Sequence, residues 1–211
     1  MRIQPAKSPA RAAVILVPKR LMADASALHS ARFFAAGGYA CEVLELSRSP
    51  RRLLDLSSTE ILDAAAKVRG AARRLKREEG VARVGVVGAW VGGTLALLAS
   101  DCEADACAVV CPYVRLPLGT GSEVPEPLDV AARAKMPILA VFGELDAEVP
   151  LEDVRALERV LSDSQREDQT YTYPGVGHAF FDNEQGNREY REAAERDLWQ
   201  RIEKFFEGSM G

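Results

Sequence analysis

Strand-like runs of apolar or aromatic residues alternate along this sequence with segments that show helical periodicity. Such alternation predicts an α/β fold, in which the strands form a parallel sheet and helices cover both of its faces. The predicted strands are Ala12–Val17, Cys41–Leu46, Val81–Val87, Ala106–Cys111, Pro137–Phe142 and Gln169–Tyr173. The predicted helices are Asp24–Ala36, Ser57–Glu79, Val91–Ser100, Leu128–Ala134, Leu151–Leu161 and Arg188–Phe206. We therefore predict a doubly wound, mostly parallel six-stranded sheet.

The length and composition of the chain fit one domain. Its 211 residues, 47% of them hydrophobic, are enough to bury a sizeable core, so we expect residues 1–211 to form a single unit. The net charge of −4 argues against nucleic acid as the main partner. No apolar stretch is long enough to cross a bilayer, and the first apolar run lacks a cleavage pattern of small residues. We therefore expect a cytoplasmic protein that does not bind a membrane.

Cysteine and histidine usage argues against a metal centre. The chain has four cysteines without a CxxC pair and only two histidines, so we expect no metal and free thiols in a reduced compartment. The glycines between Gly88 and Gly93 do not follow Gly-x-Gly-x-x-Gly, and no Walker lysine follows them. No cofactor is expected. The expected partner is a small-molecule substrate, and the expected assembly is a monomer or a homodimer.

The loop after the third predicted strand is rich in glycine. Ligands of doubly wound sheets bind at the carboxyl ends of the strands, so these loops are the first candidates for a site. This loop has the sequence Gly-Ala-Trp-Val-Gly-Gly from Gly88 to Gly93. Small residues two before and two after a central residue are typical of a sharp strand-to-helix turn that carries a nucleophile. The central residue here is Trp90.

Two polar residues follow the last two predicted strands. Asp146 comes soon after the fifth strand, and His178 comes soon after the sixth. A buried Asp orients a His and stabilises its protonated form, and such a pair serves as a general acid and base. The order of glycine-rich turn, acid and base along the chain is that of α/β-hydrolases. The alternative is that the pair only ties two loops together.

Several motifs together make the chain resemble the dienelactone hydrolase family of α/β-hydrolases. That family shows Gly-x-Cys-x-Gly-Gly, then an Asp a few residues after a Phe-Gly pair, then Gly-x-Gly-His-x-Phe. The matching residues here are Gly88, Gly92, Gly93, Phe142, Gly143, Asp146, Gly175, Gly177, His178 and Phe180. The stretch AAERDLWQRIEKFF also resembles the family's last helix. The resemblance covers Ala12 to Phe206 and implies a compact α/β-hydrolase core without a lid domain.

The sequence departs from that family at three places in the site. The family's nucleophilic Cys is replaced by Trp90, whose indole donates a hydrogen bond, accepts none and cannot form an acyl-enzyme. The first loop of the family resembles His-Glu-x-x-Gly, whereas residues 17–21 here are Val-Pro-Lys-Arg-Leu. The family often has an Arg soon after its His, where this chain has Phe181 and Asp182. The joint loss of thiol and Glu favours a changed or a lost chemistry.

The remaining candidate residues lie in or beside the loops at the strand ends. Trp90 either fills a disused pocket or forms a wall for an unsaturated or cationic ligand. Lys19, Arg20 and Arg115 are expected to bind an anionic substrate group or to stabilise an enolate, and ordinary surface charge is the alternative. The other expected substrate-binding residues are Ala89, Val91, Cys111, Tyr113 and Phe180.

Three functional hypotheses follow from these residues. In the first, His178 is the acid and base and Asp146 its orienter, in a cyclisation, isomerisation, lyase or hydration reaction without a nucleophile. Its substrate is a small or medium carbonyl, lactone or polyketide-like compound. In the second, the protein binds a ligand without converting it, and the His-Asp pair is a relic. In the third, Cys111 is a relocated nucleophile, which requires a lowered thiol pKa.

Overall fold

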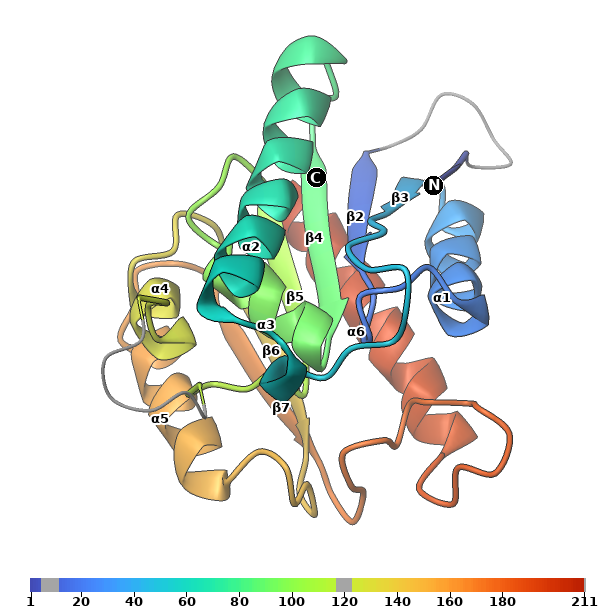
Figure 1. Cartoon of the computed structure of the whole chain (residues 1–211), viewed down its shortest axis with the longest axis vertical. Helices are drawn as coiled ribbons and strands as arrows, with labels where there is room; N and C mark the ends of the chain where they lie inside the picture. The colour runs from blue at the N-terminus through green and yellow to red at the C-terminus, as the bar shows by residue number, and fades with distance from the viewer. Residues whose placement is uncertain (5–11, 117–122, 211) are drawn as a thin grey trace.

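A seven-stranded sheet forms the centre of the protein (Figure 1). The structure, a computed structural model, describes residues 1–4, 12–116 and 123–210. The strands are β1 (Arg2–Ile3), β2 (Ala13–Val17), β3 (Ala40–Val43), β4 (Val84–Ala89), β5 (Ala106–Val110), β6 (Ile138–Gly143) and β7 (Gln169–Tyr173). Their order is β1-β3-β2-β4-β5-β6-β7, and every neighbouring pair except β1 with β3 is parallel. The prediction of a mostly parallel α/β sheet is confirmed.

The predicted number of six strands is wrong by one short edge strand. β1 runs antiparallel to β3, with Arg2 opposite Glu42 and Ile3 opposite Cys41. The Arg2 guanidinium also forms ion pairs with Glu42 at 2.7 Å and with Glu79 at 2.6 Å. A strand of two residues is too short to show the alternation by which strands are recognised in a sequence.

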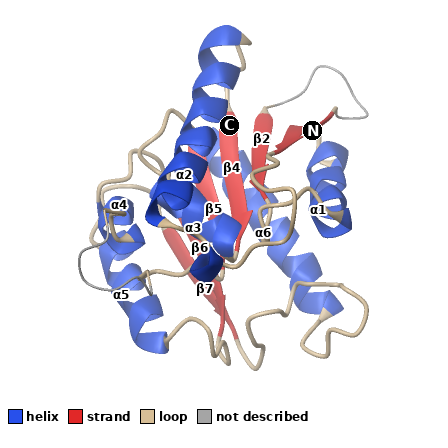
Figure 2. Ribbon diagram, in the orientation of Figure 1, coloured by secondary structure: helices blue, strands red, loops and turns tan. Residues whose placement is uncertain are grey.

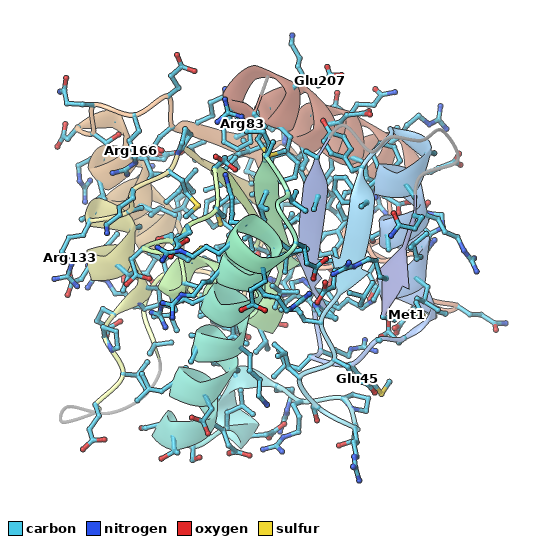
Figure 3. The ribbon with its side chains drawn as sticks, turned by 90° about the horizontal axis from the view of Figure 1, so that it is seen from above. Met1, Glu45, Arg83, Arg133, Arg166 and Glu207 are labelled. Atoms are coloured by element: carbon cyan, nitrogen blue, oxygen red, sulfur yellow. The ribbon has the colours of Figure 1, made fainter. Side chains whose placement is uncertain are left out.

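Helices cover both faces of the sheet. They are α1 (Ala25–Ala36), α2 (Ser58–Arg73), α3 (Val91–Leu98), α4 (Pro127–Ala132), α5 (Leu151–Ser162) and α6 (Glu192–Met210). Helices α2 to α5 pack on one face, and α1 and α6 pack on the other (Figures 1 and 2). In the view from above, α6, which carries the labelled Glu207, lies across the sheet from α2 (Figure 3). The sheet is therefore doubly wound, as predicted.

The central strands are buried on both faces, which explains their continuous apolar sequences. Every residue of β5 is buried, and its side chains alternate between the two cores: Cys107 and Val109 face one core, and Val110 faces the other. In the second core, Phe34 of α1 packs on Trp199 and Phe206 of α6, with ring centroids 5.9 and 6.1 Å apart. This two-sided packing holds the carboxyl ends of the strands in fixed positions.

Helix α2 begins as predicted but ends differently. The Ser57 side chain accepts the backbone N–H of Glu60, and the Glu60 carboxylate accepts the backbone N–H of Ser57, as in a capping box. The α-helical part ends at Arg73 and continues as a π-helical turn, η2 (Arg74–Glu78), rather than as α-helix to Glu79. A short 3₁₀ helix, η1 (Leu53–Asp55), precedes α2 and was not predicted.

Helix α6 starts four residues later than predicted, at Glu192 instead of Arg188. The segment before it is bonded to the loop after β7: the Arg191 N–H donates to the Phe180 carbonyl at 2.8 Å. The Glu189 carboxylate also accepts the N–H of Ala179 at 2.9 Å. These bonds hold residues 188–191 against the loop instead of in the helix.

The proline-rich loop predicted at 112–127 falls partly outside the described residues. No helix within the described ranges is long and apolar enough to cross a membrane. The single domain and the cytoplasmic location stay predictions.

Candidate functional site

Trp90 occupies a strained turn between β4 and α3. Its φ of 50° and ψ of −121° lie in a region that costs a non-glycine residue about 1–3 kcal/mol. The Trp90 N–H donates to the Val110 carbonyl at 2.9 Å, and the Trp90 carbonyl accepts the N–H of Thr94 at 2.9 Å. The surroundings hold the backbone of a nucleophile-bearing turn, although the side chain is not a nucleophile.

Gly88 and Gly92 make this turn possible. A Cβ atom added at Gly88 would lie 2.3 Å from the Gly92 carbonyl oxygen. A Cβ atom added at Gly92 would lie 2.3 Å from the carbonyl oxygen of Val17 and 2.5 Å from that of Pro18. Both positions require a hydrogen in place of a side chain, because strand and helix approach each other this closely.

The structure brings Asp146 and His178 together. His178 Nδ1 lies 2.7 Å from Asp146 Oδ2, and the side chains are 9% and 1% exposed. Asp146 Oδ1 accepts the N–H groups of Glu148 at 2.8 Å and Val149 at 3.0 Å. Burial acts to raise the pKa of Asp146, but the hydrogen bond and charge of His178 and the two backbone N–H groups outweigh it and lower the pKa. Asp146 is therefore a carboxylate that orients His178.

We expect Asp146 to make the protein sensitive to acid. A carboxyl whose pKa is lowered by folding stabilises the native state fully above its unfolded value of about 4, and this stabilisation is lost as the pH falls through the lowered value. Urea unfolding of the wild type and Asp146→Asn at neutral pH and near pH 3 measures this. The loss of stability on acidification should be smaller in the variant, and an equal loss in both would contradict the assignment.

The Trp90 indole lies face to face with the His178 imidazole. The ring centroids are 5.1 Å apart with an interplanar angle of 14°, and indole Nε1 donates to the His178 carbonyl at 3.2 Å. Phe181 packs on the indole with a centroid distance of 5.6 Å. The indole thus covers one face of the imidazole ring and leaves the edge with Nε2 for other contacts.

Glu148 provides the contact at that edge. Its Oε2 lies 3.6 Å from His178 Nε2 and accepts the hydroxyl of Tyr113 at 2.7 Å. Glu148 is not among the residues predicted from the sequence. The signal was its place two residues after Asp146, in the same loop at a strand end.

A cleft of about 540 Å³ lies beside Trp90, His178 and Glu148. Of the predicted residues, Lys19, Arg20, Trp90, Val91, Tyr113 and His178 line it; the lining residues that were not predicted are Pro50, Arg51, Arg52, Asp55, Glu148, Ala179 and Glu189. A cleft of this size accommodates a small or medium organic molecule.

The predicted cations of the cleft are paired. Lys19 Nζ lies 2.5 Å from Asp182 Oδ1, and both side chains are buried. Arg20 pairs with Glu184 at 2.8 Å. Lys19 Nζ and Arg20 Cζ also lie 5.3 and 5.7 Å from the Trp90 ring centroid. The cations therefore contact the indole directly, as cation–π partners.

Three other predicted residues lie outside the cleft. Ala89 borders a neighbouring cavity of about 30 Å³. Arg115 lies elsewhere because its guanidinium pairs with Asp153 at 3.0 Å. Phe180 is fully buried in the core, where its ring packs on Tyr173. These three residues do not line the cleft, and their role in substrate binding stays a prediction.

Cys111, the candidate for a relocated nucleophile, also lies outside the cleft. Its side chain is fully buried, its φ is 45°, and it does not line the cleft. Burial raises the pKa of its thiol well above the ordinary value, and the neighbouring Asp146 raises it further. A nucleophilic thiol needs the opposite shift. Burial and the raised thiol pKa therefore argue against the hypothesis of a relocated nucleophile, which stays a prediction to test.

We expect the native protein to resist thiol alkylation. Cys41, Cys107 and Cys111 are buried, and burial raises the pKa of Cys41 to about 12; Cys102 is half-buried. Intact mass after iodoacetamide at about pH 8 should show at most one adduct, on Cys102, and four adducts after unfolding in urea. Native labelling of Cys111 would restore it as a candidate nucleophile.

One group of side chains has metal-binding donor atoms close together. The candidate ligand atoms of Cys111, Asp146 and His178 all lie within 4.8 Å of one another. Asp146 is already bonded to His178 and to two backbone N–H groups, and burial keeps the Cys111 thiol protonated. These contacts satisfy the cluster through hydrogen bonds. The expected absence of a metal stays a prediction.

The strained turn, Asp146 and His178 follow β4, β6 and β7, an arrangement that is typical of the α/β-hydrolase class. The whole fold agrees: a crystal structure assigned to a dienelactone hydrolase of Klebsiella pneumoniae superposes with a TM-score of 0.81 at 19% identity, over 97% of this chain and 90% of that one. A structure of esterase 2 from Thermogutta terrifontis superposes with a TM-score of 0.73 at 17% sequence identity, over 97% of this chain and 87% of that one.

The chain belongs to the dienelactone hydrolase family, whose sequence profile matches residues 45–210. A carboxymethylenebutenolidase of Rhodococcus opacus is 31% identical over 126 residues, which are 58% of this chain and 49% of that protein. A Salmonella typhimurium protein assigned the same activity is 30% identical over 125 residues, 59% of this chain and 46% of its own length. The chain thus spans about half the length of these relatives.

Proposed function

We propose that this protein catalyses an acid–base reaction of a small or medium carbonyl or lactone compound without forming an acyl-enzyme. The observation that carries the proposal is the bonded His178–Asp146 pair beside a cleft whose strained turn holds Trp90. An indole cannot accept an acyl group. A His that is oriented by a buried Asp still serves as a general acid and base.

His178 Nε2 is the group that exchanges the proton. It takes a proton from a carbon next to a carbonyl, or from water that attacks the carbonyl carbon. Asp146, bonded to Nδ1, stabilises the resulting imidazolium. Return of the proton to a different atom of the substrate completes an isomerisation, a cyclisation, an elimination or a hydration. The step needs no oxidant and no cofactor.

The first turn of α3 offers donors for the negative charge that develops on the carbonyl oxygen. Its first intrahelical bond runs from the Thr94 N–H to the Trp90 carbonyl, so the N–H of Val91 has no partner within the helix. Val91 lines the cleft. In hydrolases of this class, the backbone N–H of the residue at this position donates a hydrogen bond to the oxyanion.

The experiment is a reaction in D₂O with a panel of enol lactones, β-keto esters and ketones, followed by ¹H NMR. Proton abstraction then appears as deuterium next to a carbonyl, and rearrangement or hydration appears as a new product. We expect His178→Ala and Asp146→Asn each to lower the rate by about 10²-fold or more. His29→Ala is the matched control because His29 is the other histidine of the chain and is exposed. Undiminished turnover in His178→Ala would refute the proposal.

A second candidate function is ligand binding without conversion. The observation that favours it is the packing of Trp90, which is stacked on His178 and flanked by Lys19 and Arg20, so that aromatic and cationic groups fill the place of the nucleophile. In the same panel, this function predicts saturable changes of Trp fluorescence with no new product and no deuterium incorporation.

A further inference from the structure

His178 has a carboxylate at each of its two ring nitrogens. Asp146 lies at Nδ1, 2.7 Å away and 1% exposed, and Glu148 lies at Nε2, 3.6 Å away and 55% exposed. The inner carboxylate is sealed from solvent and holds the ring. The outer carboxylate is exposed to the cleft and to solvent, so it can exchange a proton with a molecule in the cleft or with water.

Glu148 is held at both ends. Its backbone N–H donates to Asp146 Oδ1 at 2.8 Å, and its carboxylate accepts the Tyr113 hydroxyl at 2.7 Å. Tyr113 is fixed in turn, because its N–H donates at 2.9 Å to the hydroxyl oxygen of Thr94, which itself donates to the Trp90 carbonyl at 3.1 Å. The outer carboxylate is thus connected to the strained turn through two hydrogen-bonded side chains.

Tyr113 stays a hydrogen-bond donor throughout the physiological pH range. Burial raises the pKa of its phenol, and the hydrogen bond and charge of Glu148 raise it further. The hydroxyl therefore directs one lone pair of Glu148 Oε2 and leaves the remaining carboxylate lone pairs for His178, water or substrate.

We propose that Glu148 is a cleft-facing acid–base residue that exchanges the Nε2 proton of His178, with Tyr113 as its positioning residue. This inference rests on the proposed function, which uses the same nitrogen. After His178 takes a proton from the substrate, the Nε2–H bond breaks and a Glu148 Oε2–H bond forms, directly after a small side-chain movement or through one water. Glu148 then returns the proton to another substrate atom or to solvent.

The groups around the His178 imidazole restrict where its Nε2 proton can go. Trp90 lies on one face of the ring, and Asp146 occupies Nδ1. The edge that carries Nε2 faces Glu148 and the cleft. A proton that leaves Nε2 therefore meets Glu148 or a molecule in the cleft.

Other charged groups near the ring are engaged elsewhere. Lys19 and Arg20 lie over the Trp90 indole and pair with Asp182 and Glu184. Further charged groups of the cleft are Arg51, which pairs with Glu60, Arg52, which pairs with Asp55, and Glu189, which accepts the Ala179 N–H. The buried Cys111 thiol lies on the Asp146 side. Glu148 is thus the carboxylate in reach of Nε2 among the described residues.

The first test is NMR of the ¹⁵N-labelled imidazole of His178 at neutral pH. Glu148→Gln keeps the shape of the side chain and removes its charge, and we expect it to shift the Nε2 resonance. Tyr113→Phe should give a smaller shift of the same resonance. The matched control is Glu152→Gln, an exposed Glu of α5, which should leave the resonance in place. An Nε2 resonance unchanged by Glu148→Gln overturns the proposal.

The second test is the deuterium-exchange rate in the carbonyl panel. Glu148→Gln should lower kcat at least about 10-fold and leave KM within about 2-fold, because the loss is in proton exchange rather than in binding. A shifted Nε2 resonance with an unchanged kcat overturns the relay. No turnover by any variant, wild type included, contradicts the proposed function instead, and the Nε2 resonance then still decides whether Glu148 is the partner of His178.

Discussion

Replacing Gly92 by Ala is expected to abolish the folded state or to reduce its stability by more than about 3 kcal/mol. The added methyl group would lie 2.3 Å from the Val17 carbonyl oxygen, a contact with backbone that cannot move without displacing β2. Helix propensity alone predicts the opposite sign, a gain of about 1 kcal/mol for Gly to Ala within a helix. Urea unfolding followed by circular dichroism therefore separates the two effects.

Gly70→Ala is the matched control. Gly70 lies in the interior of α2, is exposed, and has no atom within 4 Å of the added Cβ. We expect this variant to be more stable than the wild type by about 0.5–1 kcal/mol. If Gly92→Ala were as stable as Gly70→Ala, the close approach of α3 to β2 would not exist in solution.

We expect the Trp90→Cys variant to carry out the first half of a covalent hydrolase reaction, the acylation of its thiol. The turn keeps the strained backbone of a nucleophile position, and His178 with its Asp146 partner lies next to the side chain at that position. A thiol placed there should lose its proton to His178 and attack an activated ester. Intact mass spectrometry after exposure to 4-nitrophenyl acetate should show one acetyl group on the variant and none on the wild type.

Two controls define the site of that reaction. The adduct should map to position 90 in the peptide digest and should disappear in the double variant Trp90→Cys with His178→Ala. Acetylation that persists without His178 would mean that the thiol reacts unaided. A Trp90→Cys protein that gains no acetyl group would show that the turn no longer supports covalent chemistry, and ligand binding would then be the better function.

The strands and the layer order could be predicted because the sheet is buried on both faces. This burial demands continuous apolar runs such as those of β4 and β5, and a parallel sheet demands helices between them. The rule that ligands bind at the carboxyl ends of strands then points to Asp146 and His178, which follow the last two strands. Where the side chains of the other predicted residues lie depends on their direction in the folded chain, which no local pattern contains.

Three residues illustrate this limit. The Arg115 side chain lies outside the cleft, where its guanidinium pairs with Asp153 of α5. Phe180 follows His178 closely in a family motif, yet the loop directs it into the core against Tyr173. Cys111 lies at the end of a central strand, and its positive φ accompanies a fully buried side chain. In each case the sequence position was informative, but the direction of the side chain was not.

For Glu148, by contrast, the position in the sequence is itself uninformative. It is an exposed Glu in an acidic loop, a position where surface charge needs no explanation. Its significance comes from the turn after Asp146, whose carboxylate binds the Glu148 N–H, and from the Tyr113 hydroxyl. Asp146 is near in the sequence, but the contact with Tyr113 becomes visible only when the ends of β5 and β6 are seen together.

The strained backbone at Trp90 also bears on how such a site changes over evolution. The codon for Trp and the codons for Cys differ by a single base, so one mutation exchanges the two residues in either direction. If the turn had relaxed after the thiol was lost, such a mutation would yield an unreactive cysteine. Because Gly88, Gly92 and the bonds of Trp90 still hold the turn, we expect such a single mutation to yield a reactive cysteine.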